Sequence, residues 1–139
     1  MRFQIILPED IHLVVPLVKK MAKASISEAL LLQRFQEMVT QNYECVGIFV
    51  GDDLIGVCGM WFCTRHYSGR SIEIDHVFIE EDFRNQGIGS ELLSWIENYA
   101  KSKDYETIEL NTYVENIKSH EFYDRKNYKK LGFHFLKSL

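Results

Sequence analysis

The order of strand, glycine-containing loop and amphipathic helix after Ser71 constrains the fold of this chain more than any other feature. Residues 71–79 form a β-rich run, and residues 87–101 carry one apolar helical face. Between them lies Arg84-Asn85-Gln86-Gly87-Ile88-Gly89, in which glycines let main-chain N–H groups converge on an anion. The pattern predicts a pyrophosphate site at a strand-to-helix turn.

This loop matches the common nucleotide-binding motifs poorly. Two glycines also suit a tight turn with no ligand, so a bare Gly-x-Gly does not decide the matter. A Walker loop is excluded because no Gly-Lys-Ser/Thr follows four spacer residues. A dinucleotide fingerprint needs a third glycine where Leu92 stands and follows the first strand of its fold, whereas several predicted strands precede this loop. Glu109 lies about 20 residues on, as a ribose ligand would, so this alternative stays open.

The whole chain is predicted to be one α+β domain over residues 1–139, because its length suits one core and no linker or repeat divides it. A turn at residues 51–53 predicts an antiparallel hairpin. Further strands are predicted over residues 2–7, 43–50, 54–64, 106–114 and 128–137, and further helices over residues 8–21, 27–39 and 118–126.

Charge and hydropathy exclude several partners. The chain has 16 basic and 20 acidic side chains, a net charge of −4, so neither nucleic acid nor a membrane surface is an expected partner. The longest apolar stretch, residues 54–63, is about half of the roughly 20 residues that a membrane span needs. The opening residues lack the apolar run of a secretion signal, so a cytoplasmic location is expected.

Neither metal nor disulfide chemistry is expected. The histidines and cysteines show no His-x-x-x-His or Cys-x-x-Cys spacing, so no metal ligands are assigned. Cys45, Cys58 and Cys63 are odd in number and lie in apolar, strand-like runs, which favours buried thiols. A catalytic cysteine is disfavoured because His66 is the only base nearby in sequence.

The glycine loop and its flanks resemble the GNAT superfamily of N-acetyltransferases. The acyl-CoA loop of that family reads Arg/Gln-x-x-Gly-x-Gly/Ala and is matched by Arg84, Gly87 and Gly89. The strand that leads into it, residues 74–83, is also similar, with Glu81 where proline is common.

The resemblance continues downstream. Residues 116–123 are similar to the Asn-x-x-Ala-x-x-Phe-Tyr segment of the family, with Ser119 in the alanine place. Asn127-Tyr128 replaces the usual Gly-Phe or Gly-Tyr, and Asn127 suits a left-handed helix end. The likeness is specific over residues 71–137 and general in element order before that.

The resemblance implies a GNAT-like α+β fold: a mostly antiparallel, twisted sheet of about six or seven strands flanked by about four helices. Acetyl-CoA, the co-substrate, would lie where the sheet splays between the strand that ends at Ile79 and the strand that begins near Glu106. Main-chain groups of the first strand would pair with the pantetheine arm, and loop amides would hold the pyrophosphate. The residues implied for this binding are Val77, Phe78, Ile79, Arg84, Asn85, Gln86, Gly87, Ile88, Gly89, Ser90 and Asn116. For Asn116, a helix cap is an equal alternative.

The resemblance also implies direct attack by a primary amine in a ternary complex, with Tyr123 as the acid that protonates the departing thiolate. The pKa of a tyrosine, about 10, is close to that of an alkyl thiol. Strand alternation predicts Ile72, Ile74, His76 and Phe78 on one face and Glu73, Asp75, Val77 and Ile79 on the other. Asp75 is preferred as the base, Glu73 is a second candidate, and a packed His76 is expected.

The acceptor is expected to be an amine of a small molecule or a peptide. Arg65, Tyr67, Arg70 and the first two helices flank the acid-bearing strand and are candidates to line its pocket. The negative net charge weakly favours a cationic amine. A homodimer is the assembly that the resemblance suggests. A non-catalytic acyl-CoA-binding regulatory module is the alternative function.

Overall fold

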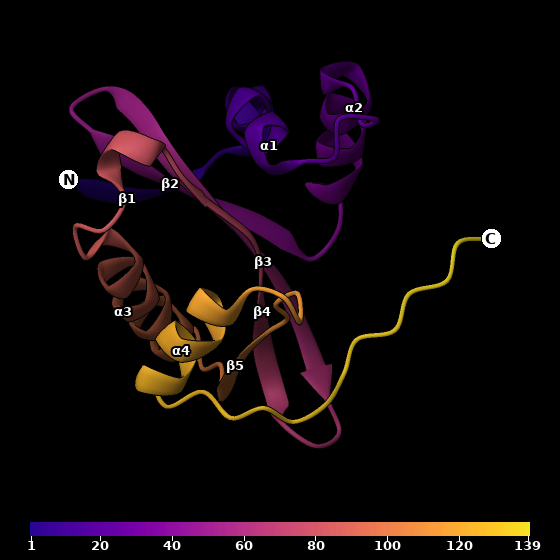
Figure 1. The fold of residues 1–139 in the computed structure, drawn as a ribbon, viewed down its shortest axis with the longest axis vertical. Coiled ribbons are helices and arrows are strands. Elements are labelled where there is room, and N and C mark those ends of the chain that lie inside the picture. The colour runs from indigo at the N-terminus through magenta and orange to yellow at the C-terminus, as the bar shows by residue number, and fades with distance from the viewer. The chain divides into compact units, whose positions relative to one another are not determined.

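The computed structural model describes residues 1–139, which form two units, Met1–Glu109 and Leu110–Leu139. The single domain expected from the sequence stays a prediction. Figure 1 shows the elements along the chain. None of the helices is both long enough and apolar enough to cross a membrane.

A sheet with the strand order β1-β2-β3-β4-β5 forms the first unit. The first four strands pair antiparallel with their sequence neighbours. The last strand begins beside the start of β4, because the Glu106 N–H donates to the Arg70 carbonyl at 2.7 Å. Farther along this strand, Glu109 accepts from the Ser71 hydroxyl, so the two strands run parallel. The strands are β1 (Arg2–Ile6), β2 (Tyr43–Val50), β3 (Asp53–Arg65), β4 (Gly69–Ile79) and β5 (Thr107–Leu110).

Helices lie on both faces of this sheet (Figure 1). On one face, a 3-10 helix, η1 (Pro8–Val14), leads into α1 (Val15–Met21), and α2 (Glu28–Met38) follows. The single helix predicted over residues 8–21 is therefore divided, and Pro16, which has no N–H, lies in the first turn of α1. Ser27 caps α2 by accepting the Leu30 N–H at 3.1 Å. On the other face lies α3 (Ile88–Ser102), preceded by a short 3-10 helix, η2 (Glu81–Phe83).

Apolar side chains fill the layer between the sheet and the α1 and α2 helices. This cluster includes Val14, Val18 and Phe35 from the helices together with Val57 and Phe78 from the sheet. The cysteine prediction is confirmed for Cys45 and Cys58, which are buried free thiols, whereas Cys63 is only half-buried. Burial raises the pKa of Cys45 to about 12, so this thiol is unreactive.

A β-bulge interrupts β4 and changes which face its side chains occupy. Cys58 pairs with Val77 whereas Gly59 pairs with Asp75, so His76 is an extra residue. The predicted strict alternation along β4 is therefore wrong beyond Asp75. Phe78 pairs with Val57 and lies on the face that α1 and α2 cover. The same face carries Glu73, Asp75 and the ring of His76. The opposite face carries Ile72, Ile74, Val77 and Ile79.

The second unit consists of α4 (Ile117–Arg125) and the segments that flank it. Asn127, just beyond the helix, has a φ of 65°, which confirms the predicted left-handed residue.

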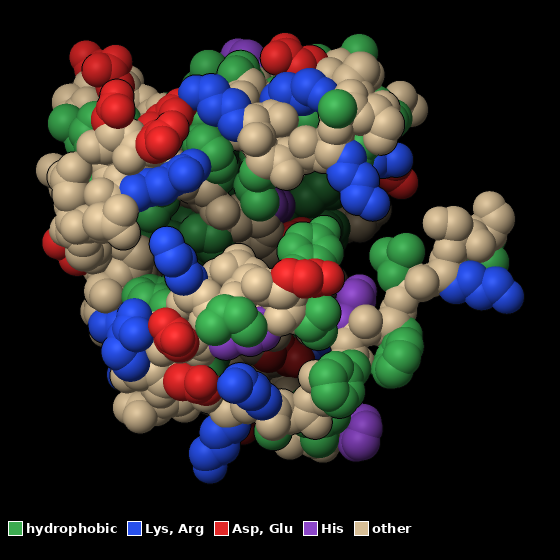
Figure 2. Space-filling model, in the orientation of Figure 1, with side chains coloured by type: hydrophobic (Ala, Val, Ile, Leu, Met, Phe, Trp, Pro, Cys, Tyr) green, Lys and Arg blue, Asp and Glu red, His purple; other side chains and the backbone are tan.

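The strand predicted over residues 128–137 is wrong, and the sheet has five strands rather than six or seven. The alternation of Leu131, Phe133 and Phe135 suits a strand, but a strand also needs a hydrogen-bonded neighbour, and this segment is in no ladder. These three side chains are more than 80% exposed. Figure 2 shows apolar side chains projecting from the C-terminal segment.

Candidate functional site

The loop between η2 and α3 has the geometry of an anion-binding turn. Asn85 and Gly87 both have positive φ, 60° and 82°, and Gly87 is the N-cap of α3. The Ser90 and Glu91 N–H groups both donate to the Gly87 carbonyl, which closes the first turn. The N–H groups of Ile88 and Gly89 have no acceptor within the helix, and they carry the positive end of the helix dipole. The loop is exposed, so an anion can reach these groups.

The end of β4, just before this loop, presents main-chain groups away from β3. The Glu80 N–H donates to the Ile55 carbonyl of β3 at 2.8 Å. Because backbone groups alternate sides along a strand, those of Ile79 and Val77 point away from β3. The Ile79 carbonyl accepts a hydrogen bond from Arg84 Nε at 2.7 Å. Arg84 therefore bridges the strand end and the loop.

An open pocket of about 360 Å³ lies at this strand end. The α1 residues Lys20 and Met21 line it together with β4 and Arg84, and Lys20 forms an ion pair with Glu80. Arg84 also lies 5.4 Å from the centre of the Phe78 ring. The pocket thus places two cationic side chains next to the anion-binding turn. Its lining includes the predicted Val77, Phe78, Ile79 and Arg84.

Glu73 and Asp75 share one face of β4, as the sequence predicts, but their environments differ. Arg65 donates to Glu73 at 3.1 Å, so Glu73 is in an ion pair. Asp75 is exposed, and its carboxylate accepts from Trp61 Nε1 at 3.0 Å and from the His76 N–H at 2.8 Å. Of the two, Asp75 has no cationic partner.

His76 is packed, as expected, but on the same face as Asp75 because of the bulge. Its Nε2 lies 2.6 Å from the Tyr43 hydroxyl, and its ring meets Phe35 edge-on at 5.2 Å between centroids. Burial lowers the pKa of His76, which keeps the ring neutral, and it raises the pKa of Tyr43. The expectation that His76 faces away from Asp75 is therefore wrong.

A polar network ties β3, β4 and β5 together at Glu109. Its carboxylate accepts from Arg65 Nε at 2.8 Å, from Tyr67 at 3.1 Å and from Ser71. Partial burial opposes ionisation of Glu109, but these three donors outweigh it and lower the pKa of the carboxyl. Since its oxygens are already occupied, Glu109 is poorly suited to bind a ribose.

Of the predicted acceptor-pocket residues, Arg65 and Tyr67 belong to this network, and Arg70 lies over the Tyr105 ring.

Asn116 and Tyr123 belong to the second unit. Asn116 caps α4 by accepting the Ser119 N–H at 3.3 Å, so the helix-cap alternative is confirmed. Tyr123 lies on α4, where its ring contacts Phe122 and Tyr128 at 5.2 and 5.5 Å between centroids. The catalytic and pantetheine roles of these residues stay predictions.

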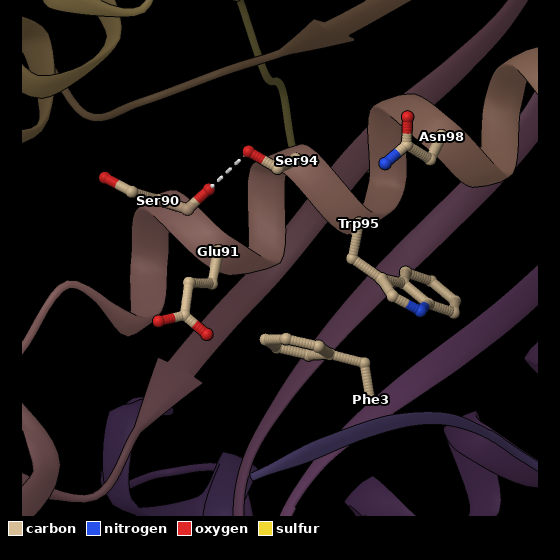
Figure 3. Close-up of a pocket in the computed structure, with 6 residues that line it drawn as sticks. All are labelled: Phe3, Ser90, Glu91, Ser94, Trp95 and Asn98. Carbon is tan, nitrogen blue, oxygen red and sulfur yellow. Dashed lines mark hydrogen bonds between the residues drawn. The ribbon is translucent and has the colours of Figure 1, made fainter.

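A second open pocket, of about 400 Å³, lies beside α3 on the side of β1 (Figure 3). Phe3 and Trp95 form its aromatic part, and their rings are 6.2 Å apart. Of the residues predicted to bind acetyl-CoA, only Ser90 lines it. This pocket is distinct from the one at the end of β4.

Three residues near the site were not identified from the sequence: Trp61, Tyr43 and Lys20. Trp61 and Tyr43 reach Asp75 and His76 only through the register of three strands and the bulge. Lys20 approaches β4 through the packing of α1. None of the three lies in a local motif. The available sequence signal was that Trp61 and Tyr43 are aromatic residues within predicted apolar strands.

Solved structures of acetyltransferases share this fold. A possible acetyltransferase from Clostridium difficile 630 is similar with a TM-score of 0.83 and 14% identity, over 99% of this chain and 96% of that one. A ribosomal-protein-alanine N-acetyltransferase from Brucella melitensis is similar with a TM-score of 0.82 and 17% identity, over 100% of both chains. At these identities the likeness concerns the fold.

Sequence comparison gives the family. An aminoalkylphosphonate N-acetyltransferase from Salmonella typhimurium is 36% identical over 74 residues, which are 53% of this chain and 48% of that protein. The match thus spans about half the length of this relative. The model of the acetyltransferase (GNAT) family matches residues 16–133. With most of its length matched and the fold shared, the chain belongs to the GNAT family of acetyltransferases.

Proposed function

We propose that this chain transfers an acetyl group from acetyl-CoA to a primary amine of a small molecule or protein, by direct attack in a ternary complex. The observation that carries the proposal is the exposed turn at Gly87, whose amides precede a 15-residue helix. A long helix that begins in a glycine turn is suited to a pyrophosphate. Family membership supplies the acyl transfer.

The chain's own groups fit such a co-substrate. Amides within the span from Arg84 to Ser90, above all those of Ile88 and Gly89, bind the pyrophosphate, and the main-chain groups of Val77 and Ile79 pair with the pantetheine arm as an added strand would. Arg84 leaves the Ile79 carbonyl to do so and adds its charge to the phosphate site. In the second unit, Asn116 can bind the pantetheine with the amide N–H₂ that its capping role leaves available.

Asp75 and Tyr123 move the protons of the reaction. Asp75 takes one proton from the ammonium, directly or through water, which frees the nitrogen lone pair. The nitrogen then forms a bond to the thioester carbonyl carbon, and the carbon–sulfur bond breaks. Tyr123 donates its hydroxyl proton to the departing thiolate, and the second proton that the nitrogen loses on forming the amide passes through water to restore the Tyr123 hydroxyl. Asp75 is the better base because Glu73 is held by Arg65.

The test is a release assay for the free CoA thiol over a panel of amines, with Tyr123→Phe as the variant. We expect turnover to fall about 100-fold, the lower range of general acid catalysis, while calorimetry gives an unchanged acetyl-CoA affinity. Tyr113→Phe is the control, since Tyr113 is 81% exposed in the same unit. An unchanged rate in Tyr123→Phe removes the assigned acid. Acetyl-CoA binding without turnover on any amine favours a regulatory module instead.

A further inference from the structure

We propose that Trp61 and Asp75 together recognise the acceptor as a cation, so that the preferred substrates are cationic amines with no acidic group near the reacting nitrogen. The inference rests on the proposed acetyl transfer and adds the substrate class. Both residues lie in the first unit, on neighbouring strands β3 and β4.

The Asp75 carboxylate is held at the surface in one orientation. Trp61 Nε1 donates to one oxygen at 3.0 Å, and the His76 N–H donates to the other at 2.8 Å. Trp61 pairs with Glu73, so its side chain lies on the same face of the sheet as Glu73 and Asp75. Each oxygen retains acceptor capacity for a further donor, such as an ammonium group.

The charge on Asp75 is uncompensated, in contrast to its neighbours. Glu73 and Glu109 are both paired with Arg65, at 3.1 and 2.8 Å. None of the ion pairs in the structure includes Asp75. The groups closest to it, His76 and Tyr43, are neutral, and Cys58 is a buried thiol. An exposed carboxylate in this state attracts a cation.

The indole ring of Trp61 provides the second half of the recognition. Its ring packs against Tyr43 at a tilt of 54° with centroids 4.9 Å apart, and it is half-buried, so part of the ring is accessible. Because Trp61 donates its indole N–H to Asp75 Oδ2, the indole holds this oxygen in the orientation in which an ammonium group meets it.

The same surface disfavours acidic acceptors. Glu73 and Glu109 share the Arg65 guanidinium through two of its nitrogens, and Asp75 adds a third carboxylate on the same face of β4 as Glu73. A phosphonate next to the reacting amine would meet net negative charge here. The relative from Salmonella typhimurium is named for aminoalkylphosphonates, so the two proteins are expected to differ in acceptor.

The first experiment compares cadaverine with aminoethylphosphonate as acceptors at saturating acetyl-CoA. We expect kcat/KM to be at least about tenfold higher for cadaverine.

In Trp61→Phe, which loses the N–H and keeps an aromatic ring, we expect KM for cadaverine to rise about tenfold with kcat little changed. Trp95→Phe, on α3, is the matched control and leaves both constants unchanged, because Trp95 lines the other pocket.

A binding measurement separates this inference from the proposed function. In Trp95→Phe, Trp61 is the one remaining tryptophan. Saturable quenching of its fluorescence by cadaverine in the presence of desulfo-CoA, and none by aminoethylphosphonate at equal concentration, supports the recognition site even without turnover. Turnover that is equal for both amines, or quenching by both alike, overturns the inference and leaves acetyl transfer standing. Cadaverine quenching with no turnover on any amine contradicts the proposed function alone.

Discussion

At Gly59 in β3, the lack of a side chain leaves room for the imidazole ring of His76. A Cβ placed at Gly59 would lie 2.3 Å from Nε2 and 2.7 Å from Cδ2 of that ring. The ring cannot move freely, since it lies between Phe35 and Tyr43. This one position therefore supports the whole aromatic cluster next to Asp75.

We expect Gly59→Ala to destabilise the protein by about 1–3 kcal/mol, the usual effect of overpacking a core. The new methyl group displaces His76 and breaks its hydrogen bond to Tyr43. Urea unfolding measures the change. Gly132→Ala is the control, because nothing lies within 4 Å of a Cβ there. Equal stability of the two variants would show that His76 adapts at no cost.

A second prediction concerns Gly87 in the anion-binding turn. Gly87→Glu brings a carboxylate to the place proposed for the pyrophosphate, so we expect calorimetry to detect no acetyl-CoA binding. The glutamate also strains a left-handed residue, which costs about 1–2 kcal/mol. Gly51→Glu is the matched control: it has a positive φ of 58° and open space around it, in a different turn. If Gly51→Glu abolishes binding as well, the loss reflects folding rather than the loop.

At the residue scale, local motifs predicted more than long-range contacts did. The helix start near Ser27, the left-handed Asn127 and the turn at Gly87 each depend on a few neighbouring residues, and all three are confirmed. The pairing of Glu73 with Arg65 and of Asp75 with Trp61 depends on strand register, which one sequence does not reveal. This is why the sequence could name the two carboxylates and prefer Asp75, but could not predict the partners of either.

At the scale of elements, the polar network around Glu109 holds the start of β5 against β3 and β4. Donors come from Arg65 at the end of β3, from Tyr67 in the hairpin turn and from Ser71 in β4. The pairing of β5 with its neighbour is short, because the strand has only four residues. The network therefore contributes to the attachment of this edge.

We expect Glu109→Gln to lower the free energy of unfolding by about 1–2 kcal/mol at neutral pH, because hydrogen bonds to a charged group are lost. The folded state lowers the pKa of Glu109 below its ordinary 4.5. The stabilisation is thus complete above that pH and is lost as the pH falls through the lower folded-state pKa. Urea titrations at successive pH values should show the two proteins converging in acid. A difference in unfolding free energy that stays constant at all pH values would contradict the role of the Glu109 charge. Glu97→Gln on α3 is the control.

The order and type of most elements could be predicted from the sequence, but the division of the first helix, the bulge in β4 and the absence of a last strand could not. The hydrophobic periods gave the β2–β3 hairpin, α2, α3 and α4 within one or two residues. The bulge at His76 leaves no mark in the period, because the three residues after it, Val77, Phe78 and Ile79, are all apolar and suit either face. The segment after Asn127 has the period of a strand without the neighbour that makes one.

At the scale of the whole molecule, binding of acetyl-CoA must stabilise the folded chain, since the unfolded chain has no such site. A ligand at about 100 times its dissociation constant adds about 2.7 kcal/mol, which for a chain of this size raises Tm by about 10 °C. We expect this shift with acetyl-CoA and with desulfo-CoA, because the pyrophosphate contacts do not involve the sulfur. NAD should leave Tm unchanged, because Glu109 is occupied and the third glycine is absent. Differential scanning calorimetry measures all three, and a shift with NAD but not with acetyl-CoA would mean that the turn at Gly87 serves a dinucleotide.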